Sequence, residues 1–197
     1  MPNSTHKILH KNMPKISQCG TQNTIVFCAN KTNINSIALW ILDTNRRIFL
    51  LCGAVGSGKT TLIQEIITCM QMQSSSQTHT KPSANHLLQA SSPTFGIRNE
   101  YGKVGKYGEV FHYDLYNVSL GEVLELGLLE WLSQQGWHFL EWGEEVLPIL
   151  QDSGFECVKI DISEEDLEKN LAQDFIENVY DKNSTQTNSK RFYKISL

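Results

Sequence analysis

The sequence predicts an α/β fold with a mainly parallel central sheet, flanking helices and antiparallel strands toward the C-terminus. An apolar run at residues 48–52 (IFLLC) has the composition of a strand buried on both faces of a parallel sheet. Further mostly apolar runs follow at residues 110–113 and 137–140. Apolar and polar residues alternate at residues 157–162 and 191–197, as in paired antiparallel strands.

Composition indicates one globular, soluble domain. The chain has 197 residues, of which 40% are hydrophobic and 19% charged, which is enough apolar material to form one core. The formal net charge is −4 and no Lys/Arg-rich run occurs, so we do not expect autonomous nucleic-acid binding. Five scattered cysteines without a CxxC pair, together with the lack of a signal-like apolar stretch, favour a cytoplasmic protein.

The N-terminal half predicts alternating strands and helices. Residues 1–22 are polar and are expected to form an N-terminal extension that can be flexible. Residues 25–28 form a short strand-like run, and residues 34–42 carry apolar side chains at helical spacing. After the strand at 48–52, residues 60–71 are expected to be helical.

The remaining segments complete one domain. Residues 71–90 are rich in Ser, Gln and Thr and predict a flexible surface insertion. Residues 120–132 predict one helix, weakened by Gly127. We therefore expect one main domain at residues 23–162, with a C-terminal excursion and final strand at 163–197 that belong to the same domain.

A phosphate-binding sequence lies between the predicted strand and helix. Residues 53–60 (GAVGSGKT) match GxxxxGK[ST], the P-loop pattern. Its glycines allow successive backbone N–H groups to point inward and bind anions beside the start of a helix. Lys59 is expected to neutralise the β and γ phosphates, Thr60 to bind Mg²⁺, and Thr61 to begin the helix.

Two carboxylates follow the later apolar runs. Asp114 comes directly after residues 110–113, and Glu141 directly after residues 137–140. Ligand sites of α/β proteins lie at the carboxyl ends of the strands. A P-loop enzyme needs such an acid to hold Mg²⁺ or position water, and the sequence leaves open which acid binds the metal directly.

Several motifs in order resemble the TsaE (YjeE) family, over roughly residues 25–150. The resemblance rests on the P-loop together with four motifs: Ser92-Pro93-Thr94-Phe95, His112-Tyr113-Asp114-Leu115-Tyr116, Leu126-Gly127-Leu128 and Glu141-Trp142. That family supplies the ATPase for tRNA threonylcarbamoyladenosine synthesis. The resemblance therefore implies a P-loop NTPase fold, ATP and Mg²⁺ as ligands, and a role in modifying tRNAs that read codons starting with A.

The resemblance also implies roles for particular residues. Asp114 and Glu141 become the catalytic acids, and Thr94 a switch-like residue on the γ-phosphate side. Trp142 would lie near the nucleotide. The implied nucleotide-binding residues are Gly53, Gly56, Ser57, Gly58, Lys59, Thr60, Thr61 and Trp142, and the implied metal-binding residues are Thr60, Glu141 and Asp114. The implied partners are TsaD and TsaB-like proteins, whose transferase complex is reset by hydrolysis, with tRNA contacted only indirectly.

Three departures from the family pattern bear on activity. The family usually has an acid at the position of Ala54, an arginine at that of Asn117 and a proline at that of Gly143. Loss of a positive charge near the transferring phosphoryl group predicts slow turnover of the isolated protein, with a partner supplying the charge.

Two alternatives stay open at this point. A small-molecule P-loop kinase would use the same phosphate loop but needs an acceptor pocket and usually an arginine-bearing lid. A nucleotide-dependent assembly module would bind ATP without useful hydrolysis, which Ala54 and Asn117 would allow.

Overall fold

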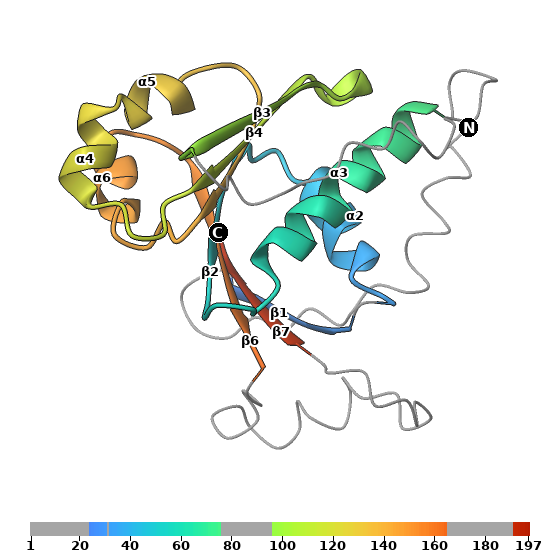
Figure 1. Cartoon of the computed structure of the whole chain (residues 1–197). Helices are drawn as coiled ribbons and strands as arrows, with labels where there is room; N and C mark the ends of the chain where they lie inside the picture. The colour runs from blue at the N-terminus through green and yellow to red at the C-terminus, as the bar shows by residue number, and fades with distance from the viewer. Residues whose placement is uncertain (1–23, 31, 76–95, 165–190) are drawn as a thin grey trace.

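A computed structural model describes residues 24–30, 32–75, 96–164 and 191–197 (Figure 1). These residues form one mixed seven-stranded sheet in the order β1-β7-β6-β2-β5-β4-β3. The strands are β1 (Thr24–Ala29), β2 (Ile48–Cys52), β3 (Arg98–Lys103), β4 (Glu109–Asp114), β5 (Trp137–Glu141), β6 (Cys157–Ser163) and β7 (Arg191–Ser196). The helices are α2 (Asn35–Asp43), α3 (Lys59–Ser75), α4 (Leu120–Glu125), α5 (Leu128–Leu132) and α6 (Leu147–Asp152), with a 3₁₀ turn η2 (Gly105–Tyr107).

The middle of the sheet is parallel and its edges are antiparallel. β2 pairs in parallel with β5 and β6, and β4 pairs in parallel with β5. β7 lies antiparallel between β6 and β1, which confirms the expected antiparallel pairing toward the C-terminus. β3 adds a further antiparallel pair against β4 that the sequence did not predict. The fold class is therefore α/β, with a mixed sheet.

Helices cover both faces of the sheet (Figure 1). One apolar core joins α2 and α3 to one face, and a second core joins α4, α5 and α6 to the other. β2 and β5 are buried along their whole length because they lie between these two layers. The fully buried apolar positions of α3 are Leu62, Ile63, Ile66, Ile67 and Met70.

Two predicted boundaries were wrong. The helix expected at residues 120–132 is divided into α4 and α5, because Gly127 adopts a left-handed conformation with φ of 91°. Helix α3 continues to Ser75, so residues 71–75 are not part of a surface insertion. The last turn is stabilised by η2, where Lys106 N donates to Ser74 Oγ (3.3 Å) and the Tyr107 hydroxyl donates to Gln73.

Other segment predictions lie outside the described residues. These are the N-terminal extension at 1–22, the part of the insertion from residue 76 onward, and residues 165–190 of the C-terminal excursion. The proposed domain boundaries stay a prediction.

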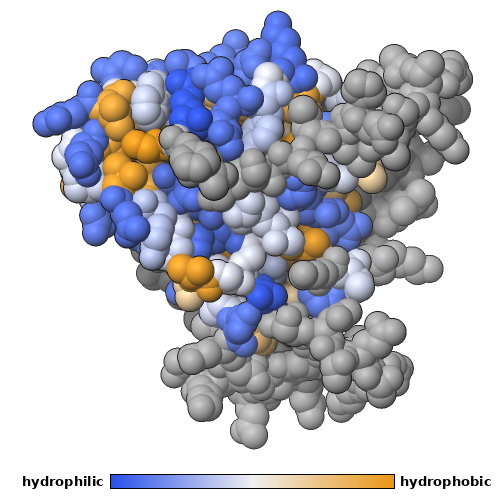
Figure 2. Space-filling model, viewed as in Figure 1, coloured by the Kyte–Doolittle hydropathy of each residue, from blue (hydrophilic) through white to orange (hydrophobic). Residues whose placement is uncertain are grey.

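The face shown in Figure 2 carries a gathering of hydrophobic residues, with smaller hydrophobic patches elsewhere. In Figure 2, hydrophobic side chains cluster over α4 and α5, in a face that is otherwise largely hydrophilic. Leu126, between these two helices, is half exposed. Among the described residues, no helix combines the length and the apolar character needed to cross a bilayer.

Candidate functional site

Residues 53–60 form the glycine loop, which runs from the end of buried β2 into the first residues of α3. Gly53 has φ of 143°, and a Cβ at this position would lie 2.4 Å from the carbonyl oxygen of Ile162. A side chain there would force the loop away from β6. Glycine at this position therefore lets the chain turn directly from the strand end into the helix.

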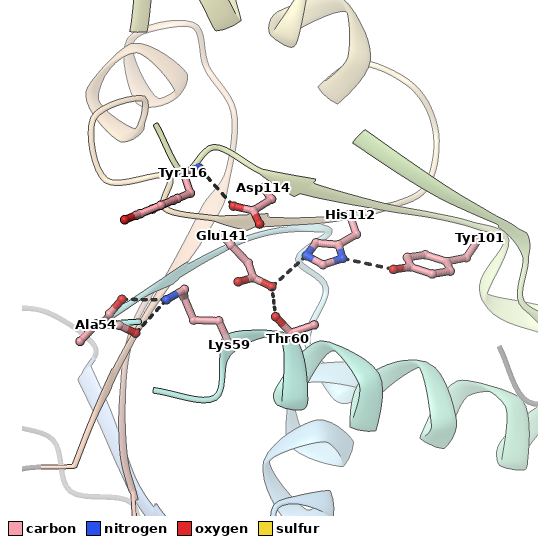
Figure 3. Close-up of polar contacts among 9 residues, drawn as sticks. Ala54, Lys59, Thr60, Tyr101, His112, Asp114, Tyr116 and Glu141 are labelled. Atoms are coloured by element: carbon pink, nitrogen blue, oxygen red, sulfur yellow. Dashed lines mark hydrogen bonds and ion pairs between the residues drawn. The ribbon is translucent and has the colours of Figure 1, made fainter. Parts of the chain in front are cut away.

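Lys59, the first residue of α3, lies folded over the glycine loop. Its Nζ donates hydrogen bonds to the carbonyl oxygens of Gly53 (2.8 Å) and Ala54 (3.0 Å) (Figure 3). The same ammonium lies 3.6 Å from the centre of the Trp142 ring, which is cation–π geometry. The lysine is 4% exposed, so its charge is positioned inside the site.

A chain of buried and partly buried hydrogen bonds links α3 to β5, β4 and β3 (Figure 3). Glu141 Oε1 accepts from the Thr60 hydroxyl at 2.6 Å and from His112 Nε2 at 2.9 Å. A carboxylate oxygen can only accept, so His112 carries its proton on Nε2. In the neutral ring Nδ1 then accepts from the Tyr101 hydroxyl at 3.2 Å. His112 is fully buried, and this chain fixes the orientation of Glu141.

Strand register brings the two predicted acids together. Asp114 and Glu141 are direct partners in the parallel pairing of β4 with β5. Both therefore lie at the carboxyl ends of adjacent strands. Asp114 Oδ1 accepts from the Tyr116 backbone N–H at 3.1 Å, which orients the carboxylate at the start of the following loop.

Trp142 has a conformation unusual for its residue type. Its φ is 62°, in the left-handed region that costs a non-glycine residue about 1–2 kcal/mol. The conformation places its indole over Lys59 and near Tyr116, with ring centres 5.0 Å apart. Strain of this kind concentrates at functional sites, so the position of the indole beside the lysine is a specific feature of the site.

The rest of the glycine loop and the start of α3 provide one buried hydroxyl and the lining of a separate cavity. Ser57 Oγ is buried and has no hydrogen-bond partner among the described residues. Buried hydroxyls are rarely left unpaired in proteins, so this group fits a ligand oxygen. Gly56, Gly58 and Thr61 line a small cavity on the side facing β1 and β7.

Burial and neighbouring acids act in opposite directions on Lys59. Burial lowers the pKa of its ammonium, while the carboxylates of Glu141, Glu144 and Asp114 raise it. Burial also raises the pKa of the neighbouring Cys52 thiol, so this group stays protonated at neutral pH. The site thus combines one cation with several acids and has no thiolate nucleophile at Cys52.

The oxygen donors at this site suit Mg²⁺, which takes only some of its ligands from the protein. They suit a metal ion that takes all of its ligands from the protein less well. The Thr60 hydroxyl and the Glu141 carboxylate are in contact, and Asp114 lies on the adjacent strand. Within the described part of the chain, no cluster of three or more His, Cys, Asp or Glu ligands occurs. Mg²⁺ keeps several waters and takes one or two carboxylates together with substrate phosphates, which matches this set.

The structure brings most of the predicted site residues together, with two additions. Lys59, Thr60, Glu141 and Trp142 form one connected group, whereas Thr94 lies outside the described residues. Sequence reasoning quoted His112 within a motif and gave it no role. The signal available was its place two residues before Asp114, which puts both side chains on one face of β4.

Arg191, at the start of β7, is the second addition. Its Nη2 donates to the Gly56 carbonyl oxygen at 3.0 Å, although the two residues are 135 positions apart. No local pattern marks it, because the contact depends on the insertion of β7 beside β6.

Comparison with known families agrees with this geometry. Residues 28–172 match the family model described as "Threonylcarbamoyl adenosine biosynthesis protein TsaE". Comparison with curated proteins found no individual match. Because the family match covers well over half of the chain, the protein belongs to the TsaE family of nucleotide-binding proteins that take part in threonylcarbamoyladenosine synthesis on tRNA.

Proposed function

We propose that this protein is a P-loop ATPase that uses Mg-ATP to reset the complex that transfers a threonylcarbamoyl group to tRNA. The observation that carries the proposal is the contact of Thr60, at the end of the glycine loop, with Glu141 at the end of β5. It places a hydroxyl and an acid of the types used in phosphoryl transfer next to the phosphate-binding lysine.

The glycine loop would hold the phosphates. Lys59 exchanges its bonds to the Gly53 and Ala54 carbonyls for the β and γ phosphate oxygens, and the Ser57 hydroxyl gains a partner. For Lys59 the exchange replaces neutral carbonyl acceptors by negatively charged phosphate oxygens, so the ammonium gains an ion pair in addition to its hydrogen bonds. The loop amides and the start of α3 add the electrostatic attraction of a helix N-terminus.

Thr60, Glu141 and Asp114 would hold Mg²⁺ and the attacking water. Mg²⁺ held by these residues would supply charge neutralisation for the phosphates. Glu141, oriented by His112, accepts a hydrogen bond from the water. Thr94 is proposed to contact the γ-phosphate side, by resemblance.

A partner would supply the missing positive charge. The chain has four arginines, and each has a place away from Glu141: Arg46 pairs with Glu156, Arg47 stacks on Trp137, Arg98 pairs with Glu100, and Arg191 contacts Gly56 and Glu164. Slow turnover in isolation is therefore expected, as for other P-loop proteins that depend on an arginine finger.

An open hollow beside the site suits such a partner. It measures about 550 Å³ and lies between the loops that follow β4 and β5. Tyr116, Asn117, Trp142, Glu144 and Glu145 contribute to its wall. Acidic side chains around an exposed aromatic ring match an arginine-bearing segment of a TsaD or TsaB-like protein.

An assembly module that binds ATP without useful hydrolysis is the second candidate. It is favoured by Asn117, which stands where the family has an arginine. The two functions differ in what they require of Glu141. If Glu141→Gln supports the modification as well as wild type while Lys59→Ala does not, binding alone is the function.

The test is nucleoside mass spectrometry of tRNA from cells depleted of this protein. Depletion should lower threonylcarbamoyladenosine, wild type should restore it, and Lys59→Ala should not. Lys103→Ala, which changes an exposed lysine of β3, is the matched control and should restore it fully. Unchanged modification on depletion would refute the proposed function.

A further inference from the structure

The two sides of the glycine loop offer different surroundings. Toward β5, Thr60 bonds to Glu141. Toward β1 and β7 there is a cavity of about 120 Å³, whose walls include Ala29, Asn30, Thr61 and Arg191. The steps proposed above for ATP hydrolysis do not involve this cavity.

A bound triphosphate would run along the glycine loop from its β5 side to its β1 and β7 side. This step rests on the proposed function, in which the γ-phosphate lies beside Thr60 and Glu141. The α-phosphate and the nucleoside then leave the loop at its other end, past Thr61. The cavity lies at that end.

The cavity has the composition of a base-binding pocket. Ala29 and Ile34 provide apolar surface. The Asn30 carboxamide oxygen accepts from the Thr32 backbone N–H (2.9 Å) and hydroxyl (2.6 Å), which leaves the amide NH₂ as the donor from this side chain. Small-ligand pockets combine apolar walls with a few fixed polar groups of this kind.

Arg191 forms a planar wall of the cavity. Its Nη2 donates to the Gly56 carbonyl oxygen (3.0 Å) and to Glu164 Oε1 (2.6 Å), and its side chain is 16% exposed. A Cβ on Gly58 would lie 3.5 Å from Arg191 Cδ and Nε, so the arginine runs alongside the loop. A guanidinium held in this way is a stacking surface for an aromatic ring.

We propose that this cavity binds the base of a purine nucleotide and that Arg191 stacks on that base, held by Gly56 and Glu164. Arg191 lies outside residues 28–172, which match the family model. A purine has the larger stacking surface and offers ring nitrogens to the Asn30 amide. Purine nucleotides should therefore bind more tightly than pyrimidine nucleotides.

The test compares ligands with and without a base. Calorimetric titration of the full chain with Mg-ATP, Mg-CTP and Mg-tripolyphosphate should show ATP binding at least tenfold tighter than the other two. Arg191→Ala should lose about tenfold in ATP affinity and stay within twofold of wild type for tripolyphosphate. Arg191→Lys keeps a donor for Gly56 and Glu164 without the planar surface, and should lose most of the preference for ATP over CTP.

Arg46→Ala is the matched control, because Arg46 is also paired with a glutamate but lies elsewhere. It should bind all three ligands as wild type does. Equal losses for ATP and tripolyphosphate in both Arg191 variants would overturn the base contact, since the arginine would then act only on the phosphate loop. Unchanged ATP affinity in both would overturn it as well.

The experiment distinguishes failure of the proposed function from failure of the proposed base site. A wild-type chain that binds neither ATP nor tripolyphosphate would overturn both proposals. A chain that binds ATP and tripolyphosphate equally tightly would overturn only the base site.

Discussion

The two sides of the glycine loop are held by different kinds of polar contact. On the β5 side, Glu141 pairs with His112, and their side chains are 5% and 0% exposed. On the β7 side, Arg191 pairs with Glu164, whose side chain is 63% exposed. Leaving a buried carboxylate without its hydrogen-bond donor costs about 1–3 kcal/mol or more, whereas an exposed ion pair contributes about 1 kcal/mol or less. The side proposed for chemistry is thus rigidly oriented, and the side proposed for base binding is held by a weaker contact.

The largest effect is expected on ATP turnover, when Glu141 on the β5 side of the glycine loop is changed. Glu141→Gln keeps an acceptor for Thr60 and His112 but removes the charge. Turnover of ATP with the partner complex should fall about 10²–10³-fold, while Mg-free ADP affinity stays within threefold. Steady-state hydrolysis and calorimetry measure the two quantities. Asp152→Asn, at an exposed acid of α6, should leave both unchanged; a Glu141→Gln variant with wild-type turnover would contradict the assignment.

A somewhat smaller effect, on stability and nucleotide binding, is expected when Gly53 is changed where the glycine loop passes β6. Gly53→Ala places a Cβ against the Ile162 carbonyl, in addition to the cost of positive φ. We expect a loss of roughly 2–3 kcal/mol in unfolding free energy and weaker Mg-ATP binding. Urea unfolding with and without nucleotide measures both.

Gly154→Ala separates the two contributions in that experiment. Gly154 also has positive φ (84°), but a Cβ there meets no atom within 4 Å. It should cost about 1 kcal/mol and leave nucleotide binding unchanged. Equal costs for the two variants would show that the contact with β6 is unimportant.

His112 should have a moderate effect that acts through Glu141. His112→Leu removes the donor that orients the carboxylate, and kcat should fall about tenfold with little change in KM. His112→Gln, whose amide can replace the Nε2 donor, should recover most of the loss. His138→Leu is the matched control, since His138 is a second buried histidine, on β5. If the two leucine variants lower kcat equally, the effect is structural.

The smallest effect concerns His138 and the pH dependence of stability. Its Nε2 donates to the Gln134 carbonyl and its Nδ1 accepts from the Tyr113 hydroxyl, both at 2.9 Å. Burial lowers its pKa below the usual 6.5. The unfolded chain therefore takes up a proton near pH 6.5 that the folded chain does not.

Stability should be complete above pH 6.5 and decline as the pH falls toward the folded pKa, by at most about 1.4 kcal/mol per pH unit. Urea unfolding at pH 7 and pH 5 should show a smaller difference in His138→Gln than in wild type. An identical difference in the two proteins would exclude His138 as the cause.

Local pattern was sufficient for the elements that define the glycine loop. β2 is a continuous apolar run, and GxxxxGKT between a strand and a helix specified the turn and the start of α3. β3 escaped prediction because Arg98–Lys103 is largely polar and half-buried at the sheet edge. α6 is a six-residue helix with a proline in its first turn, too short to show periodicity.

Contacts between distant residues could not be predicted. The bond of His112 to Glu141 depends on the parallel register of β4 with β5, and that of Arg191 to Gly56 depends on where β7 inserts. In both cases the residue type is common and the partner lies far away in the sequence, in another strand for His112 and in the glycine loop for Arg191. The acids Asp114 and Glu141 were predictable because the carboxyl ends of parallel strands share one edge.

The position of β7 between β1 and β6 has a consequence for folding kinetics. Thr24 pairs with Ser196 and Ala29 with Arg191, so this part of the sheet joins segments separated by most of the sequence. Closing so long a loop is entropically costly, and contacts of high sequence separation form slowly. The β2-β5-β4 region can form first, and the docking of β1 onto β7 then completes the sheet. Asn30 and Arg191 flank this last pairing, so a nucleotide bound between them would stabilise the slowest contact of the fold by mass action.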